Sequence, residues 1–227
     1  MQTLDAIRGR KSIRAYLPTP VPREAIARIL DASRWTPSGT NRQNWRVTVA
    51  TGQPLQRLVA RMDERVRETQ PGLFDPETAR PEVKRRVLAL RAGLNEVAEA
   101  LDKPLWEFVV AGSYRFFDAP VVLAVSHRGG SAANVAPFVT TLLIAAHDQG
   151  LGTVWLGYPL GAADLIQEEL GIPEDERLSA IVALGYPDPD SPAAAFRSQR
   201  DGVQAFTRWV GLEDRGGQRT HADGRTT

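Results

Sequence analysis

Residues 10–45 read RKSIRAYLPTPVPREAIARILDASRWTPSGTNRQNW, which is an extended segment, a helix and a polar loop in succession. The prolines of the first part favour extended backbone, because a residue before proline is driven away from helical geometry. Pro22 then stands where a helix can begin, and Ile26, Ile29 and Leu30 have the three- and four-residue spacing of a buried stripe. The stretch therefore predicts one short helix, followed by a loop rich in Ser, Thr, Asn and Gln.

Outward from this stretch, helices and strands are mixed along the chain. Apolar or β-branched runs predict strands at residues 45–50, 119–125, 153–156 and 178–184. Helices are expected at residues 3–9, 135–147 and 162–170, and residues 53–112 are helical, charge-rich and interrupted by QPGLFDP. This order predicts an α+β fold with a sheet covered by helices on both sides. A doubly wound dinucleotide fold fits poorly, because no strand is followed by a G-x-G-x-x-G turn.

The composition is that of an ordinary globular protein, and 227 residues are enough for one substantial domain. The 28 Lys and Arg residues nearly cancel the 27 Asp and Glu residues, so no global field favours nucleic acid or an acidic membrane as a partner. The absence of cysteine excludes disulfides, thiolate catalysis, iron–sulfur clusters and cysteine-ligated zinc. Because the sequence has no signal-like or membrane-spanning apolar run, a cytoplasmic location is expected.

Two basic segments lie near opposite ends of the chain. Arg10, Lys11, Ser12 and Arg14 place three cations and a hydroxyl within five residues, which suits a phosphate-binding site. The segment RSQR, which ends at Arg200, can close such a site from the far end of the chain. Both segments also have a plainer interpretation as ordinary solvated surface charge.

Two further segments have the composition of a site for a flat polar ring. The loop at residues 35–45 encloses hydrogen-bonding side chains between two tryptophans. Residues 150–158, GLGTVWLGY, place glycines on both sides of a short strand, which lets the backbone approach a planar ligand closely. Alternatively, the loop is a turn whose side chains bond only their own backbone, and Trp155 belongs to the core.

The helix expected at residues 135–147 is apolar nearly all round, which indicates that other structure or a partner subunit encloses it. Its His147 is interpreted as a core histidine rather than a catalyst. No two of His127, His147 and His221 have metal-ligand spacing, so no metal site is expected.

In combination and order, the four polar or basic segments resemble the FMN-dependent nitroreductase family. Residues 10–45 match the family's R-R-S-I-R…P-V…PSG-x-N-x-Q-P-W signature. The agreement continues in SYRFFDAPVVLAV, AAHDQGLGTVWLGY and LSAIVALGYP, so that it covers residues 5–210 apart from a part between 55 and 113 that matches only in helical character. Two residues depart from the signature, because Lys11 replaces an arginine and Asn44 replaces a proline. The change at Asn44 means that the substrates of relatives cannot safely be assigned to this chain.

The resemblance implies an α+β homodimer, with a central mixed or antiparallel sheet flanked by helices and FMN bound in each of two clefts at the subunit interface. Arg10, Lys11, Ser12 and Arg14 should then hold the FMN phosphate and ribityl chain, and Arg200 should complete the phosphate site. Trp155, Leu156 and Gly157 should line the isoalloxazine ring, which Pro37, Ser38, Gly39 and Asn41 should reach from the other subunit. Arg115 falls where family members often place a basic residue near the pyrimidine edge of the flavin.

The activity that the resemblance implies is hydride transfer from NADH or NADPH, through the flavin, to a small electron-poor acceptor such as a nitroaromatic or a quinone, with ping-pong kinetics. Since the flavin carries the chemistry, no side chain is assigned as general acid or base, and Arg115 is only a candidate stabiliser of the reduced flavin. The alternatives are an enone reductase or reductive dehalogenase of the same family, and a flavin-binding sensor or storage protein without turnover.

Residues 1–210 are expected to form a single FMN-binding domain. Its variable helical region at residues 53–112, together with the adjoining Tyr114, is expected to supply the substrate-facing wall, with Trp106 and Phe108 among its members. Residues 211–227 fall to Gly, Arg, Thr and Asp in composition, which predicts a disordered tail.

Overall fold

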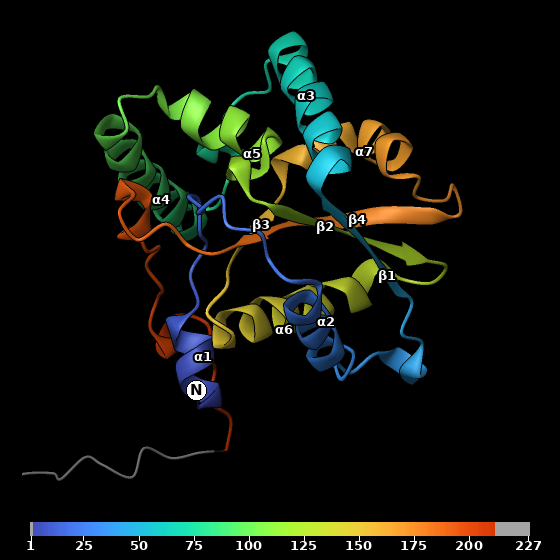
Figure 1. The fold of residues 1–227 in the computed structure, drawn as a ribbon. Helices are drawn as coiled ribbons and strands as arrows, with labels where there is room; N and C mark the ends of the chain where they lie inside the picture. Colours follow the sequence, from blue (N-terminus) through green and yellow to red (C-terminus); the bar gives the residue numbers. More distant parts are fainter. Residues whose placement is uncertain (1, 212–227) are drawn as a thin grey trace, which may run out of the picture.

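Four antiparallel strands form one sheet in the order β1-β2-β4-β3 in the computed structural model, which describes residues 2–211 (Figure 1). The strands are β1 (Trp45–Thr51), β2 (Val121–Arg128), β3 (Gly152–Leu156) and β4 (Glu176–Gly185). The two central strands are buried on both faces, as their continuous apolar sequences require. All four strands predicted from the sequence are present, and the α+β class with an antiparallel sheet is confirmed.

Helices cover both faces of this sheet. One face carries α1 (Thr3–Gly9), α2 (Arg23–Ser33) and α6 (Val135–Asp148), and the other carries α3 (Gly52–Thr69), α5 (Gly112–Tyr114) and α7 (Ala163–Leu170) (Figure 1). The helix α2 follows Pro22 and buries Ile26 and Ile29, as its stripe predicts. The helix α7 ends at Gly171, whose φ of 61° is the left-handed conformation that glycine adopts without strain.

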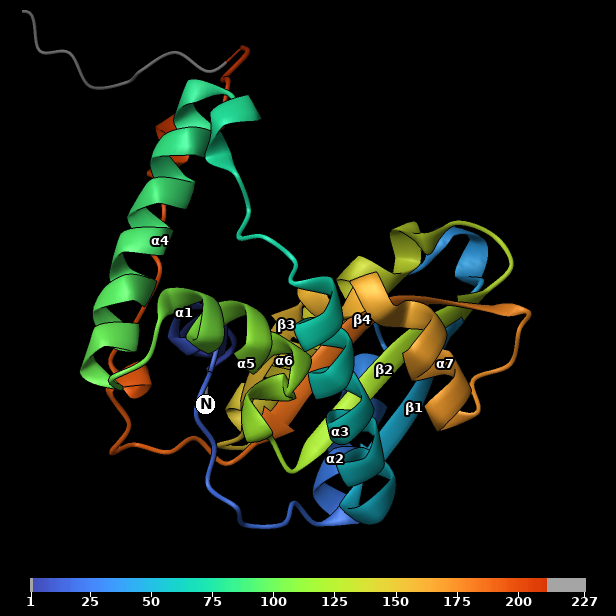
Figure 2. The same cartoon turned by 90° about the horizontal axis from the view of Figure 1, so that it is seen from above.

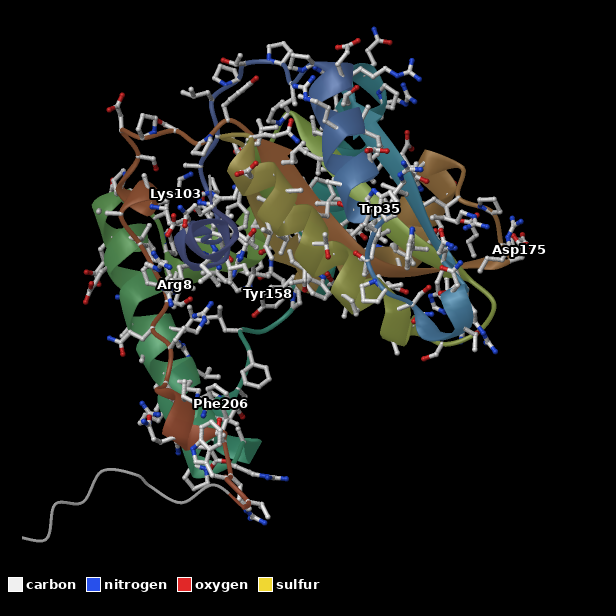
Figure 3. The ribbon with its side chains drawn as sticks, turned by 90° about the horizontal axis from the view of Figure 1, so that it is seen from below. Arg8, Trp35, Lys103, Tyr158, Asp175 and Phe206 are labelled. Atoms are coloured by element: carbon white, nitrogen blue, oxygen red, sulfur yellow. The ribbon has the colours of Figure 1, made fainter. Side chains whose placement is uncertain are left out.

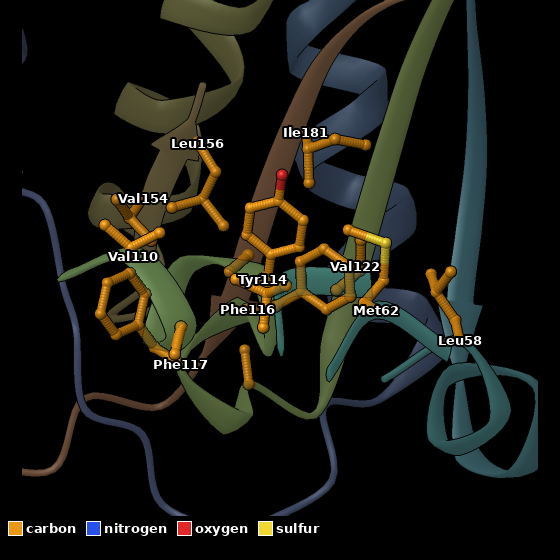
Figure 4. Packing of buried hydrophobic residues seen from close by; sticks show 14 of the residues in the cluster. Leu58, Met62, Val110, Tyr114, Phe116, Phe117, Val122, Val154, Leu156 and Ile181 are labelled. Carbon is orange, nitrogen blue, oxygen red and sulfur yellow. The ribbon is translucent and has the colours of Figure 1, made fainter. Parts of the chain in front are cut away.

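The two layers have separate apolar cores. Below the sheet, in the view of Figure 1, Trp45 stacks on Phe138 of α6 with ring centroids 4.9 Å apart. Above it, Leu58 and Met62 of α3 pack with Phe116 against the sheet (Figure 4). Because each core is continuous with one face of the same sheet, the strands hold both helical layers in fixed positions.

The helix α4 (Pro81–Ala100) stands away from the sheet (Figure 2). The end of the chain runs along it, where Asp201 forms ion pairs with Arg85 and Arg86 at 2.8 and 2.6 Å. At Gly93 a β-carbon would lie 2.5 Å from the ring of Phe196, so the two segments approach as closely as glycine permits. The region 53–112 is therefore helical, as expected.

Short turns complete the described chain. A π-helical turn spans Glu107–Ala111, and 3-10 turns lie at Gly39–Asn41, Pro76–Thr78, Phe116–Asp118, Ala132–Asn134, Tyr158–Ala162, Pro192–Ala194 and Val203–Ala205. Within residues 2–211, no helix is long and apolar enough to cross a membrane, and the cytoplasmic location stays a prediction. The boundary of a single domain at residue 210 also stays a prediction, and apart from residue 211 the predicted tail lies outside the described residues.

Candidate functional site

The first motif leaves α1 and runs beside the edge strand β3. Ser12 forms a parallel bridge with Thr153, and the backbone N–H of Ile13 donates a hydrogen bond of 3.0 Å to the Thr153 carbonyl. Ile13 is buried, whereas its neighbours Ser12 and Arg14 are half-buried, because alternate side chains of an extended segment point to opposite sides. The sheet edge therefore fixes the positions from which the cationic side chains project.

A segment near the end of the described chain, residues 194–200, comes together with this motif, as the sequence predicts. Arg10, Lys11, Arg197 and Arg200 form what we call the basic cluster. The Lys11 ammonium group donates a hydrogen bond to the Ala194 carbonyl, and the Arg197 guanidinium donates one to the Arg8 carbonyl. The described ion pairs of residues 2–211 all involve cations outside the cluster, and Asp148 lies at the same cavity as Arg10 and Lys11.

The positive charges of the basic cluster shift the pKa of Arg10 within it. Burial lowers the pKa of Arg10, and the positive charges of Arg200 and Arg197 lower it further. Removing a proton from Arg10 would relieve this repulsion, and so would an anion placed between the guanidinium groups. Since arginine keeps its proton in proteins, the cluster is a site for a strongly anionic group such as a phosphate.

His147 belongs to the surroundings of the basic cluster and not to the core, which corrects the interpretation from the sequence. It is half-buried near the end of α6 and lines a cavity with Arg10 and Lys11. Its Nε2 atom lies where a β-carbon on Gly9 would be only 2.6 Å away. Burial lowers the pKa of His147, Arg10 lowers it further, and Asp148 opposes them, so the free protein favours the neutral imidazole.

A second cavity lies along β3, on the other side of Arg14, and we call it the β3 cavity. Its volume is about 210 Å³. Arg14 of the first motif lines it, together with Val109 and Ser113. The end of β3 and the residues after it contribute Trp155, Leu156, Gly157 and Tyr158. The loop before α4 contributes Leu73 and Phe74, and α4 itself contributes Val87, Leu90, Arg91 and Leu94. Trp155 is 40% exposed, and a β-carbon at Gly157 would meet nothing within 4 Å. The end of β3 therefore offers an open surface to a flat ligand.

The loop between α3 and α4 is held at this cavity by two aromatic side chains. The hydroxyl of Tyr158 accepts a hydrogen bond of 3.0 Å from the backbone N–H of Phe74, and Trp106 Nε1 donates one of 2.9 Å to the Pro71 carbonyl. Trp106 thus supports the wall without lining it. Phe108 and Tyr114 are buried in the core and do not line the β3 cavity, and their expected substrate-facing role stays a prediction.

The wall residues that the sequence analysis missed come mainly from α4. Val87, Leu90, Arg91 and Leu94 share one face of this helix, at the three- and four-residue spacing of a helical stripe. That spacing is visible in the sequence. A stripe can bury its apolar face in the core or beside a ligand, and the pattern alone does not separate the two.

The polar loop lies at the far end of α6 from the basic cluster. The backbone N–H of Gly39 donates to Asn134, just before α6, and the N–H of Gln43 donates to the Ser38 hydroxyl. Because α6 has 14 residues, its two ends are about 20 Å apart at 1.5 Å per residue. One chain therefore does not bring Pro37, Ser38, Gly39 and Asn41 to the residues of the first motif.

Asn44, which replaces the proline of the family signature, anchors the polar loop through side-chain hydrogen bonds. Its side-chain amide donates to the carbonyls of Gly129 and Ser131 and accepts a hydrogen bond of 2.8 Å from Asn134. The residue is buried, and proline could make none of these bonds. Asn44 thus joins the loop to the turn before α6.

Arg115 is half-buried and forms an ion pair of 3.4 Å with Asp63 of α3. It lines a small neighbouring cavity with Arg14 and Phe117, and it does not line the β3 cavity. Its predicted place at the pyrimidine edge of a flavin stays a prediction.

Together, the basic cluster and the β3 cavity suit a ligand with an anionic end and a flat, largely apolar end. Arg10 belongs to the first and Arg14 to the second, and four residues of extended chain span roughly 13 Å. Within the described part of the chain, no group of three His, Asp or Glu side chains is placed to hold a metal ion. The geometry is that of a binding site for an elongated phosphorylated ring compound.

Comparison with known proteins agrees with this geometry. The sequence model of the Nitroreductase family matches residues 7–186. A chloronitrobenzene nitroreductase of Comamonas testosteroni is 28% identical over 91% of this chain and 96% of its own length. A 4-nitrobenzoate reductase of Pseudomonas putida is also 28% identical, over 91% of this chain and 95% of its own length.

Solved structures share the fold. The FMN-dependent nitroreductase NfnB of Mycobacterium smegmatis, determined in complex with NADPH, superposes with a TM-score of 0.81 at 23% identity and covers 91% of this chain and 97% of its own. An iodotyrosine deiodinase bound to FMN superposes with a TM-score of 0.64 at 24% identity, over 93% of this chain and all of its own. At these identities the likeness shows the fold alone.

Proposed function

This chain belongs to the nitroreductase family, and from that premise we propose that it is an FMN-dependent oxidoreductase that passes hydride from NAD(P)H to a small electron-poor aromatic acceptor. The observation that carries the proposal is the pairing of a basic cluster, whose arginines repel one another, with an open, flat-walled cavity along one extended segment. A relative such as the chloronitrobenzene nitroreductase supports a nitroaromatic acceptor.

The residues present fit FMN. Arg10, Lys11 and Arg200 would hold its phosphate, and Ser12 and Arg14 would contact the chain and ring between the phosphate and the β3 cavity. Trp155, Leu156 and Gly157 would lie along one face of the isoalloxazine ring, where the backbone is open. When bound, FMN supplies the capacity to accept and return a hydride, which no side chain of this protein has.

The protein's own part is to bind and to orient. The helix α4 and the loop at Leu73 and Phe74 line the β3 cavity opposite β3, so a flat reductant or acceptor would be held between them and the flavin ring. Since the same cavity receives NAD(P)H and then the acceptor, ping-pong kinetics are expected. Arg14 lines this cavity, and its guanidinium would stabilise negative charge that develops on the ring.

We also propose that the active form is a homodimer. Pro37, Ser38, Gly39 and Asn41 of the partner subunit would complete the flavin site, because the chain's own copy of this loop lies about 20 Å away along α6. The outer side of α6 carries exposed Ala136 and Pro137, exposed Thr140 and half-buried Ile144. Figure 3 views the molecule from this side, where α6 runs uncovered, and the nearby Trp35 is 77% exposed.

The decisive experiment is an acceptor screen with NADH and NADPH. The purified protein is expected to be yellow, to release FMN on denaturation and to oxidise the reduced nicotinamide when a nitroaromatic or a quinone is supplied. A faster reaction with an enone or a halogenated phenol would favour an enone reductase or a dehalogenase. Tight FMN binding with slow nicotinamide oxidation, whatever the acceptor, would indicate a flavin-binding sensor. A colourless protein that ignores added FMN would refute the proposal.

The basic cluster makes its own prediction. Changing Arg10 or Arg200 to Ala removes a charge-assisted bond to the phosphate, so each variant is expected to bind FMN weaker by about 1.5–3 kcal/mol. Fluorescence titration of the apoprotein with FMN measures this loss directly. Arg23→Ala, which removes an exposed arginine at the start of α2, serves as the control. Unchanged FMN affinity in both cluster variants would show that the phosphate binds elsewhere.

A further inference from the structure

The helix α4 separates two grooves and presents a different face to each. The groove between α4 and residues 192–201 contains Arg85 and Arg86, both paired with Asp201. The β3 cavity receives the other face, on which Arg91 stands among Val87, Leu90 and Leu94. Arg91 is thus the one charged side chain that α4 contributes to the β3 cavity.

Arg91 lacks the partners that the other cations of this helix have. Lys84 pairs with Glu77 at 2.6 Å, and the residues one helical turn before and after Arg91 are Val87, Leu88, Leu94 and Asn95, which are all uncharged. Within residues 2–211, no ion pair or hydrogen bond is formed by the Arg91 side chain. Its five N–H donors are therefore free to bind a ligand.

The other residues that line the β3 cavity indicate which class of ligand Arg91 can bind. Its lining is mainly apolar, from Leu73, Phe74, Leu90 and Leu94 on one side and the end of β3 on the other. Such walls favour an aromatic ring, and a planar guanidinium at their edge favours a carboxylate, which it can bind through two parallel hydrogen bonds. Arg14, the second cation of the cavity, belongs to the segment that runs beside β3 and is assigned above to the flavin.

We propose that the β3 cavity takes an aromatic acceptor that carries an anionic substituent, and that Arg91 is the residue that selects it. This inference rests on the proposed function and adds a substrate class to it. The substituent binds at α4, which places the opposite end of the ring toward Trp155 and Gly157, along which the flavin ring would lie. Arg91 acts on binding and orientation and takes no part in proton or hydride transfer.

The test compares two acceptors that differ only in charge, 4-nitrobenzoate and 4-nitrobenzamide. Arg91→Met is expected to lower kcat/KM for the acid about 10- to 100-fold, mainly through KM, and to change that for the amide less than about twofold, because only the acid loses a charge-assisted bond. Arg91→Lys should restore part of the loss. Arg80→Met, which removes an exposed arginine before the same helix outside the cavity, should leave both acceptors unchanged.

A binding measurement completes the test without turnover. Titration of the FMN-loaded protein with benzoate in a calorimeter should show binding that Arg91→Met weakens and Arg80→Met does not. Equal loss with both acceptors, or no loss with either, would overturn the inference, and so would an increase in the KM for NADPH that is the same for every acceptor. If the wild-type protein oxidises NAD(P)H with neither of these acceptors nor with a quinone, the proposed function fails instead, and benzoate binding still decides the role of Arg91.

Discussion

A Thr140→Arg variant is expected to be a folded monomer that has lost its FMN and its activity. Thr140 lies on the exposed side of α6, and its hydroxyl bonds only the Ala136 carbonyl in its own helix. A longer charged side chain therefore disturbs nothing within the chain. At a dimer interface it would be buried without a partner, at a cost of about 3–5 kcal/mol, which is enough to dissociate most of the dimer at micromolar concentration.

The loss of cofactor follows from where the two halves of the site lie. The basic cluster is at one end of α6 and the polar loop is at the other, so in the proposed dimer a separated subunit would retain only the flavin contacts of its own basic cluster and β3 cavity. Sedimentation velocity, FMN content and the thermal unfolding curve should be measured together. Gln56→Arg, an equal change on the exposed side of α3, should retain the dimer and the flavin. A dimeric, yellow Thr140→Arg protein would place the interface elsewhere.

The strands and most helices could be predicted from the sequence because burial leaves a direct pattern. The run APVVLAV has no polar residue to interrupt it, and β2 is accordingly buried on both faces. The proximity of Arg10 and Arg200 could also be predicted, because Arg10 belongs to the stretch that matches the family signature and the resemblance extends to residue 210, which includes Arg200. Their proximity in the structure is consistent with that prediction.

The sequence predicts Arg14, Trp155, Leu156 and Gly157 at the site, and all four line the β3 cavity, but the α4 side chains that line it could not be predicted, for a physical reason. Periodicity shows which residues of a helix share a face, but not whether that face meets the core, a ligand or solvent. Trp106, Phe108 and Tyr114 are large and apolar, and two of them are simply core. Arg91 has no unusual neighbour in the sequence, and only the position of α4 relative to β3 distinguishes it from the paired arginines before it. The same reason applies to His147, because its place on an apolar helix predicts a core histidine, whereas its side chain lines a cavity with Arg10 and Lys11.

A Gly152→Val substitution is expected to remove the cofactor site by detaching the first motif from the sheet. A β-carbon at Gly152 would lie 2.7 Å from Ile13 Cγ1 and 2.9 Å from Pro187 Cγ, closer than real side chains come. Ile13 is held in place by its own hydrogen bond to Thr153, so the branched side chain must displace the segment that carries Arg10 and Arg14. We expect a loss of stability of about 1–3 kcal/mol, as in overpacked cores, together with nearly complete loss of bound FMN.

A second substitution separates this explanation from general destabilisation. Ile13→Ala alone opens a gap beside Gly152, and it should cost stability by removing a buried side chain. In the double variant the new valine occupies that gap, so the two losses should not add, and both the unfolding midpoint and the FMN content should recover in part. If the losses simply add, the contact between Ile13 and Gly152 is not what holds the motif on β3. If displacement of the first motif is the only cause, stability and FMN content should recover together. A recovery of stability without a recovery of FMN content would show that the new valine interferes with flavin binding directly.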